Sequence, residues 1–220
     1  MHFTGREVVV WVGGCILAAA SVPGCGGAAG AWLYWFAPVP EEKVKAEYKL
    51  GKGRLLILID DDKGWLSDPT IRPLLTEALT KQFDEHDVNH FVVPADHVVR
   101  LRQKDPDFER RGAREIGQRL KADQVLHLNV RTFTLHDDVV APAYKGRFAV
   151  AVKVLDVSAS KPEDVRLWPN STEGKLLEVT TELHAGKGEG YNDELTRRLC
   201  EEMADKIAKL FYDHKVPKPL

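Results

Sequence analysis

The hydrophobic and polar residues of this chain fall into one long uncharged run followed by shorter patterned segments. The run extends from Val8 to Pro40 and contains no Asp, Glu, Lys or Arg. From about residue 53 onward, apolar positions recur with the periods that are typical of strands and helices. We therefore expect a hydrophobic leader in front of one folded domain.

The first half of the folded part predicts alternating strands and helices. Residues 54–60 form a continuous apolar run of the length expected for a strand covered on both faces. A helix is expected after Thr70, which we take as its N-cap, and residues 90–93 predict a short second strand. Two helical segments follow, up to Gln103 and over residues 112–121. The first helix buries a stripe at helical spacing: Ile71, Leu74, Leu75, Ala78, Leu79 and Phe83.

A long strand with one polar face comes next. Its apolar residues alternate with His127, Asn129 and Arg131, which share the other face. The apolar phase shifts after Arg131, and this shift predicts a β-bulge near Arg131 and Thr132. A half-solvated sheet face is the common interpretation of such a pattern, and an interaction surface is the alternative.

The remaining elements complete a mixed α/β domain. Residues 144–157 and 177–183 alternate as two further strands, with a polar loop over 161–174 between them. A closing helix should open near Asn192 and end at His214–Lys215. The order is strand, helix, strand, helix, three-stranded meander and helix. It predicts an α/β fold with a single mixed-sheet domain behind the N-terminal hydrophobic leader.

Composition narrows the functional classes. The 220 residues are 44% hydrophobic and 29% charged, and 31 basic against 33 acidic residues give a net charge of −2. Nucleic-acid-binding proteins carry a clustered excess of basic residues, and this sequence has none, so its composition argues against that class. The folded part holds one cysteine, Cys200, which we expect to be a small core residue and not a nucleophile.

The leader contains a candidate lipid-attachment site at Cys25. Residues 8–20 resemble the apolar region of a secretory signal peptide. The sequence VPGC, ending at Cys25, resembles a bacterial lipobox, with Val22 three positions before the cysteine and Gly24 just before it. The sequence VGGC, ending at Cys15, fits the same pattern but leaves only about five apolar residues ahead of it.

An uncleaved membrane anchor is the alternative to lipidation. The uncharged run exceeds the roughly 20 residues that span a bilayer. Its glycines and Pro23 make a poor continuous helix, so we favour lipidation at Cys25. We assign residues 1–24 to the signal peptide or anchor, 25–52 to a tether and 53–215 to the α/β domain. Both alternatives place this domain on the extracytoplasmic side of the membrane, in the cell envelope.

The acidic sequence Asp60–Asp61–Asp62 follows the first strand, where open α/β sheets often bind ligands. Three carboxylates provide the oxygen ligands that Mg²⁺ or Ca²⁺ prefers. No glycine-rich phosphate loop accompanies them, so we favour a solvated acidic turn over a metal site.

Other candidate chemistry is sparse, and we expect no cofactor, metal or catalytic residues. His86, His90 and His97 form the closest histidine group, but an extended backbone separates the last two by more than about 10 Å. We interpret them as surface histidines. The glycine-rich segment at residues 186–190 lacks the spacing of a phosphate loop and predicts a flexible turn.

One segment carries a resemblance to a known family. Residues 114–126, with the sequence REIGQRLKADQVL, resemble the helix-to-strand junction of the TolB amino-terminal domain and of CsgG-like curli-assembly lipoproteins. The element order over residues 53–213 is similar as well. The resemblance implies an α/β domain that acts without catalysis as an assembly, scaffold or partner-binding module in the periplasm.

The sequence leaves two functional hypotheses. The first is a membrane-tethered, non-enzymatic envelope lipoprotein whose domain binds another envelope protein or itself. The second is a small-ligand or divalent-metal-binding enzyme that uses the acidic strand end at Asp60–Asp62.

Overall fold

A computed structural model describes residues 41–135, 143–184 and 191–217 of the chain. These residues form a compact unit over Glu41–Val216. The leader with Cys25 and the glycine-rich segment at 186–190 lie outside the described residues. Within the described ranges, no helix combines the length and the apolar composition needed to cross a bilayer.

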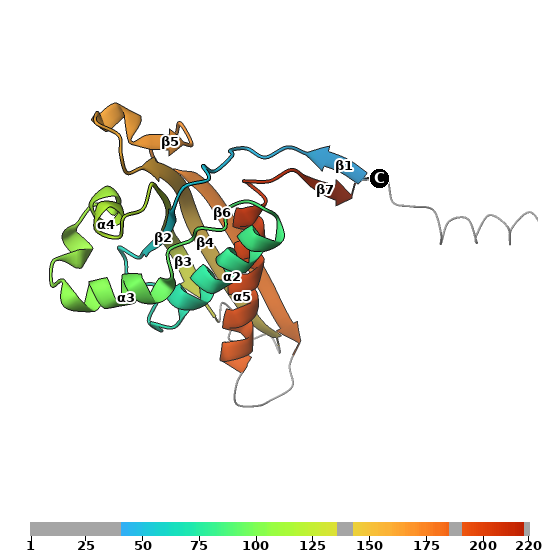
Figure 1. Cartoon of the computed structure of the whole chain (residues 1–220). Coiled ribbons are helices and arrows are strands. Elements are labelled where there is room, and N and C mark those ends of the chain that lie inside the picture. The colour runs from blue at the N-terminus through green and yellow to red at the C-terminus, as the bar shows by residue number, and fades with distance from the viewer. Residues whose placement is uncertain (1–40, 136–142, 185–190, 218–220) are drawn as a thin grey trace, which may run out of the picture. The chain divides into compact units, whose positions relative to one another are not determined.

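A five-stranded mixed sheet forms the centre of this unit (Figure 1). Strand β2 (Leu55–Asp60) runs parallel to β3 (Gln124–Thr134), and β3 pairs antiparallel with β4 (Ala143–Asp156). The far edge of β4 pairs antiparallel with two strands in succession, β5 (Arg166–Trp168) and β6 (Lys175–His184). The fold is therefore a single α/β domain with a mixed sheet, as the element order predicts.

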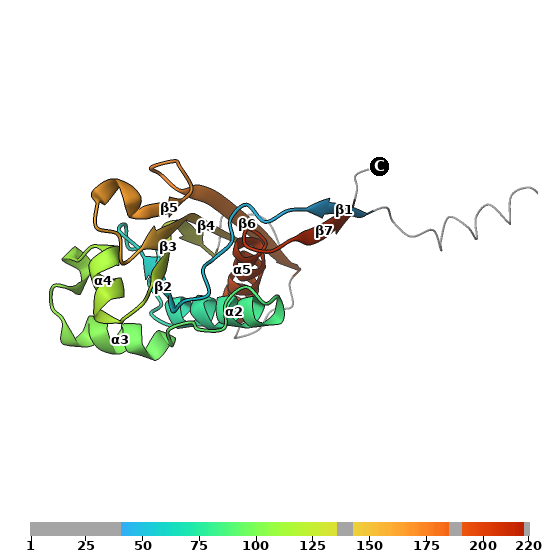
Figure 2. The same cartoon turned by 45° about the horizontal axis from the view of Figure 1, so that its top comes forward.

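Two long helices cover one face of the sheet. Helices α2 (Ile71–Glu85) and α5 (Tyr191–Ala208) lie side by side under the strands (Figure 2). Their apolar stripes pack on the residues of the sheet that point to this face, with Phe83 and Leu199 fully buried. This layer contains the larger of the two apolar clusters and therefore supplies most of the buried core.

Shorter helices cover part of the opposite face. They are α3 (Ala95–Lys104), the 3₁₀ turn η1 (Phe108–Arg110) and α4 (Ala113–Arg119). Their cluster includes Leu56 and Leu58, while the alternate residues of β2 join the larger core. Residues Leu55–Ile59 of β2 are all apolar because this stretch is covered on both faces, as its sequence predicts.

The two ends of the described chain meet in a separate two-stranded sheet. Strand β1 (Glu41–Val44) pairs with β7 (His214–Pro217). The backbone N–H groups of Glu47 and Tyr48 then donate to the carbonyl of Leu210. The segment expected as a tether therefore contains a strand and contacts the end of the domain.

Several predictions from the sequence are confirmed element by element. The first strand, the helix after Thr70, the helix at Gly112 and the three long strands all occur close to their expected ranges. The strand register also shifts between Val130 and Thr132, which confirms the predicted bulge.

Four predictions of local structure need correction. Residues 90–93 form only one bridge, between Leu55 and Val92, because α3 begins directly after Pro94. Thr70 occupies the N-cap position of α2, as predicted, but its side chain makes no capping hydrogen bond, because its backbone is helical (φ −75°, ψ −21°) and not extended. The loop over 161–174 contains the turn η2 (Pro162–Asp164) and strand β5, which pairs with β4.

The closing helix is also shorter than predicted. It ends at Ala208, although Leu210 and Phe211 beyond it are buried as expected. The chain leaves the helical path there because residues from His214 onward pair with β1. Hydrophobic spacing alone does not reveal this switch, since the apolar residues after the helix pack on the same core.

Candidate functional site

The structure brings together two sets of polar residues that lie far apart in the sequence. Asp60 ends β2, and its Oδ2 lies 2.7 Å from Nε2 of His127 on β3. The Asn129 side-chain amide donates to Asp62 Oδ2 at 2.7 Å. Parallel pairing of β2 with β3 creates both contacts, because it places the acidic strand end beside the polar face of β3. The His127 and Asp60 side chains are only 14% and 24% exposed.

Asp61 has a structural role, and the prediction of a solvated acidic turn is wrong at this position. Its side chain is 1% exposed. Its two carboxylate oxygens accept the backbone N–H groups of Trp65 and Leu66 at 2.8 and 2.7 Å. One guanidinium nitrogen of Arg72 lies 3.7 Å away. Asp61 therefore holds the loop between β2 and α2 in place.

The described residues give no support to a metal site at this strand end. Within the described ranges, no group of three or more His, Cys, Asp or Glu side chains is placed to hold a metal ion. The three adjacent aspartates point to different partners, so they do not share one coordination centre.

The three neighbouring histidines also separate in the structure. His86 stacks on Tyr212, with ring centroids 4.0 Å apart and planes inclined by 12°. His90 lies 3.1 Å from a carboxylate oxygen of Asp84 and 3.2 Å from one of Asp87. His97 is exposed on α3. This outcome agrees with their interpretation as surface histidines.

Three cationic side chains extend the polar region across the sheet. Lys153 on β4 is the register partner of His127 on β3, so the two share one face. Arg131 at the bulge and Arg166 on β5 are exposed and act electrostatically on Lys153. Burial, followed by the two arginines, lowers the pKa of Lys153, and Asp62 and Glu173 offset only part of this effect.

An apolar strip lies beside these cations. Ala149 and Ala151 share the Lys153 side of β4 and are buried. Leu176 on β6 is the register partner of Ala151 and is 62% exposed. We call this side of the sheet the open sheet face, and define it by these residues: Asn129, Arg131, Ala149, Ala151, Lys153, Arg166 and Leu176.

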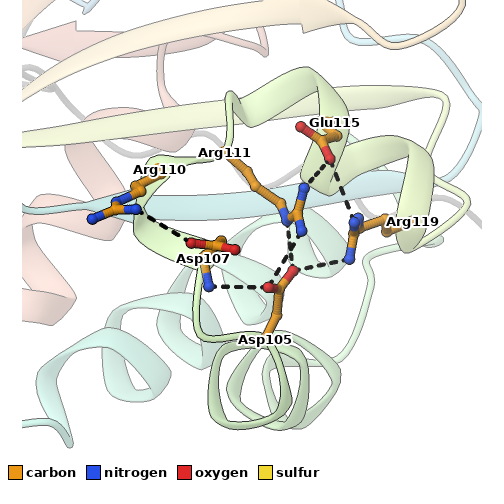
Figure 3. Close-up of polar contacts among 6 residues, drawn as sticks. All are labelled: Asp105, Asp107, Arg110, Arg111, Glu115 and Arg119. Atoms are coloured by element: carbon orange, nitrogen blue, oxygen red, sulfur yellow. Dashed lines mark hydrogen bonds and ion pairs between the residues drawn. The ribbon is translucent and has the colours of Figure 1, made fainter.

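A second charged cluster, centred on Asp105, joins elements and is not a candidate site (Figure 3). Asp105 Oδ2 lies 2.6 Å from Nε of Arg111 and 2.9 Å from Nη1 of Arg119. Glu115 completes the network through both arginines. Hydrogen bonding to Arg111 lowers the pKa of Asp105 and raises that of Arg111. The charges satisfy one another and fix α3 to α4.

Cys200 is a core residue, as predicted. Its side chain is fully buried on α5 and belongs to the larger apolar cluster. Burial raises the pKa of its thiol to about 12, so the thiolate is absent at neutral pH.

Sequence reasoning identified His127, Asn129 and Arg131 but missed Lys153, Arg166 and Leu176. Lys153 continues the row of Ala149 and Ala151, so the alternation of β4 contained a signal for its face. Arg166 had no such signal, because its strand was expected to be a loop. Leu176 precedes the range that was expected to form the next strand.

Comparisons with known proteins find similarity in structure alone. No family profile matches the chain, and no curated protein matches it. The hypothetical protein CT253 from Chlamydia trachomatis is 14% identical, with 72% of this chain and 96% of that chain covered and a TM-score of 0.41. A PelC dodecamer from Paraburkholderia phytofirmans is 12% identical, with coverages of 76% and 96% and a TM-score of 0.41.

A lipoprotein, GNA1162 from Neisseria meningitidis, is also similar to this chain. It is 14% identical, with 69% of this chain and 98% of that chain covered and a TM-score of 0.38. At these identities and TM-scores, the similarities carry no conclusion about the function of this protein.

Proposed function

We propose that this chain is a membrane-tethered, non-catalytic envelope lipoprotein. Its tether is attached through Cys25, and its α/β domain binds another envelope protein or a second copy. The attachment follows from the lipobox-like sequence that ends at Cys25 and from the apolar run before it.

The uneven covering of the sheet is the observation that carries the binding role. Helices α2 and α5 bury one face along β2, β3, β4 and β6. Among the described residues, the cluster of α3, η1 and α4 reaches the other face only around β2, the start of β3 and the end of β4. Leu176 lies 62% exposed on the uncovered part. Exposed apolar surface rimmed by charged residues is typical of protein interaction sites.

The polar residues beside this surface favour recognition over chemistry. The Asp61 carboxylate accepts hydrogen bonds from two backbone N–H groups, and the Asp62 carboxylate accepts one from the side-chain amide of Asn129. Asp60 and His127 bind each other. These pairings hold the side chains at the strand end, beside the open sheet face, in fixed positions. A preorganised surface loses less conformational entropy when a partner binds.

Photo-crosslinking in cells tests the binding role. A photoreactive phenylalanine analogue replaces Leu176 in the full-length chain, and a control chain carries it at Lys81, which is 74% exposed on α2. We expect a discrete, light-dependent adduct from position 176 in the membrane fraction and none from position 81. Adducts at neither position, or equally at both, would contradict the proposal.

A further inference from the structure

We infer that the open sheet face recognises an acidic segment of a partner protein. The carboxylates of this segment would pair with Arg131, Lys153 and Arg166, and its apolar side chains would contact Leu176. The inference rests on the proposed function and names the chemistry of the partner.

The cations are arranged across three neighbouring strands. Lys153 occupies the centre on β4, Arg131 lies at the bulge of β3, and Arg166 lies on β5 opposite Leu155. The register places Arg166 on the same side as Lys153, because Arg166 lies opposite Leu155, two residues further along β4. Both arginines lie close enough to Lys153 to act on it electrostatically. A partner segment laid across the strands would meet all three charges.

The positive charge on this surface is only partly compensated. Among the described residues, no carboxylate lies within 4.0 Å of the charged nitrogens of Arg131, Lys153 or Arg166. Arg166 donates to the backbone carbonyl of Asn170 at 3.4 Å, which leaves its charge unneutralised. Burial is the main cause of the lowered pKa of Lys153; the two arginines lower it further, and the nearby acids Asp62 and Glu173 offset less than the arginines contribute. An incoming carboxylate would relieve this repulsion.

The apolar strip favours a protein segment as the occupant. Leu176 is 62% exposed and supplies apolar surface beside the charged side chains, next to its buried register partner Ala151. Arginine at the rim and apolar residues at the centre are characteristic of protein interfaces. A small inorganic anion would pair with the cationic side chains but would leave Leu176 exposed to solvent.

Fluorescence anisotropy with the detergent-solubilised full-length chain tests the inference. The probe is a rhodamine-labelled heptapeptide of alternating glutamate and leucine, and its counterpart has glutamine in place of each glutamate. We expect the glutamate peptide to bind, the glutamine peptide to bind at least about tenfold more weakly, and binding to weaken as salt rises.

A matched pair of double variants locates the binding surface. The variant Arg131→Glu/Arg166→Glu reverses two exposed charges of the open sheet face. The control Arg100→Glu/Arg110→Glu changes the net charge by the same amount as the first variant. Its two arginines lie on α3 and η1, and both are exposed. We expect about a tenfold loss of affinity in the first and less than about twofold in the second, with unchanged melting temperatures for the first.

Three results would overturn the inference: absence of glutamate-peptide binding, an equal loss in both double variants, or preferential binding to vesicles of phosphatidylglycerol or to inorganic phosphate. The photo-crosslink from position 176 distinguishes this failure from failure of the proposed function. If the adduct forms but the glutamate peptide does not bind, only the inference of an acidic partner is contradicted. If the adduct is also absent, the proposed binding role is contradicted as well.

Discussion

At the scale of single residues, buried polar side chains fix backbone segments that have no regular structure. Asn89 is 4% exposed, and its amide donates to the carbonyls of Gly51 and Gly53 at 2.8 and 2.9 Å. Its carbonyl oxygen accepts the N–H of Phe91 at 2.7 Å. Asn89 thereby joins the segment before β2 to residues 90–93, which form the bridge to β2.

Replacement of this residue should destabilise the domain. Asn89→Ala leaves two carbonyls and one N–H without a partner, and we expect the free energy of unfolding to fall by about 2–4 kcal/mol. Urea unfolding of the full-length chain, followed by tryptophan fluorescence, measures the change. Asn170→Ala is the control at an exposed asparagine, and a loss no greater than that of the control would contradict this role.

Cys200 should be chemically inert while the protein is folded. Its burial and a thiol pKa of about 12 keep the reactive thiolate absent at pH 8. We expect negligible maleimide labelling of the Cys200 peptide under native conditions and rapid labelling in guanidinium chloride, as measured by mass spectrometry. Labelling at similar rates in both conditions would show that the thiol is accessible.

The residue scale also shows why the candidate site was only partly predictable. Alternation placed His127, Asn129 and Arg131 on one polar face, and the structure retains this face for His127 and Asn129, whereas Arg131 lies at the bulge where the register shifts. It could not connect His127 to Asp60, 67 positions earlier, because that contact depends on the parallel register of β2 and β3. One sequence contains no direct signal of this register.

At the scale of elements, close packing sets the position of α4 on the sheet. A Cβ atom at Gly117 would lie 2.7 Å from Val157 Cγ2 and 2.8 Å from Val125 Cγ2. These side chains belong to the smaller apolar cluster and have little freedom to move. The absence of a side chain at Gly117 therefore permits the close approach of helix and strand.

Gly117→Ala should destabilise the domain although alanine favours helices. We expect a net loss of about 1–2 kcal/mol in the free energy of unfolding, because overpacking outweighs the gain in helix propensity. Gly112→Ala is the control, since no atom lies within 4 Å of its added Cβ. Urea denaturation compares the two, and a Gly117→Ala variant as stable as the original chain would contradict this packing.

The ion-pair network at Asp105 should make the junction of α3 and α4 sensitive to acid. The pKa of Asp105 is lowered in the folded protein, so its contribution is fully present above its unfolded pKa of about 3.9. It is lost as the pH falls through the lowered folded pKa. We expect Asp105→Asn to melt below the original chain at pH 7, and the gap to close as the pH falls below about 4.

Thermal melts of both chains across this pH range measure the effect. Asp107→Asn is a suitable control, because the one ion pair of its carboxylate among the described residues is with the exposed Arg110, at 3.6 Å. A gap between the original chain and Asp105→Asn that stays constant into acid would show that the charge of Asp105 is unimportant.

Sequence patterns predicted long elements better than short ones. The long strands and α2 have enough apolar residues to reveal their period. Strands β1, β5 and β7 have three or four residues each and are largely polar or half-buried. Their extended form depends on pairing with a distant segment, so local sequence could not identify them.

At the scale of the whole molecule, a hydrophobic leader precedes a domain with an unevenly covered sheet. The leader predicts attachment to a membrane, and the open sheet face supports a binding role for the attached domain. Attachment would confine the domain to the membrane surface and raise its effective concentration near envelope partners. The tether is therefore the central claim, because the proposed partners depend on where it holds the domain.

The intact mass of the mature protein, purified from membranes of a Gram-negative host, tests this claim most directly. We expect a chain that begins at Cys25 and carries covalent acyl groups, and we expect Cys25→Ser to abolish acylation while Cys15→Ser leaves it unchanged. A mature chain that retains Met1, or that begins elsewhere without a lipid, would contradict the account.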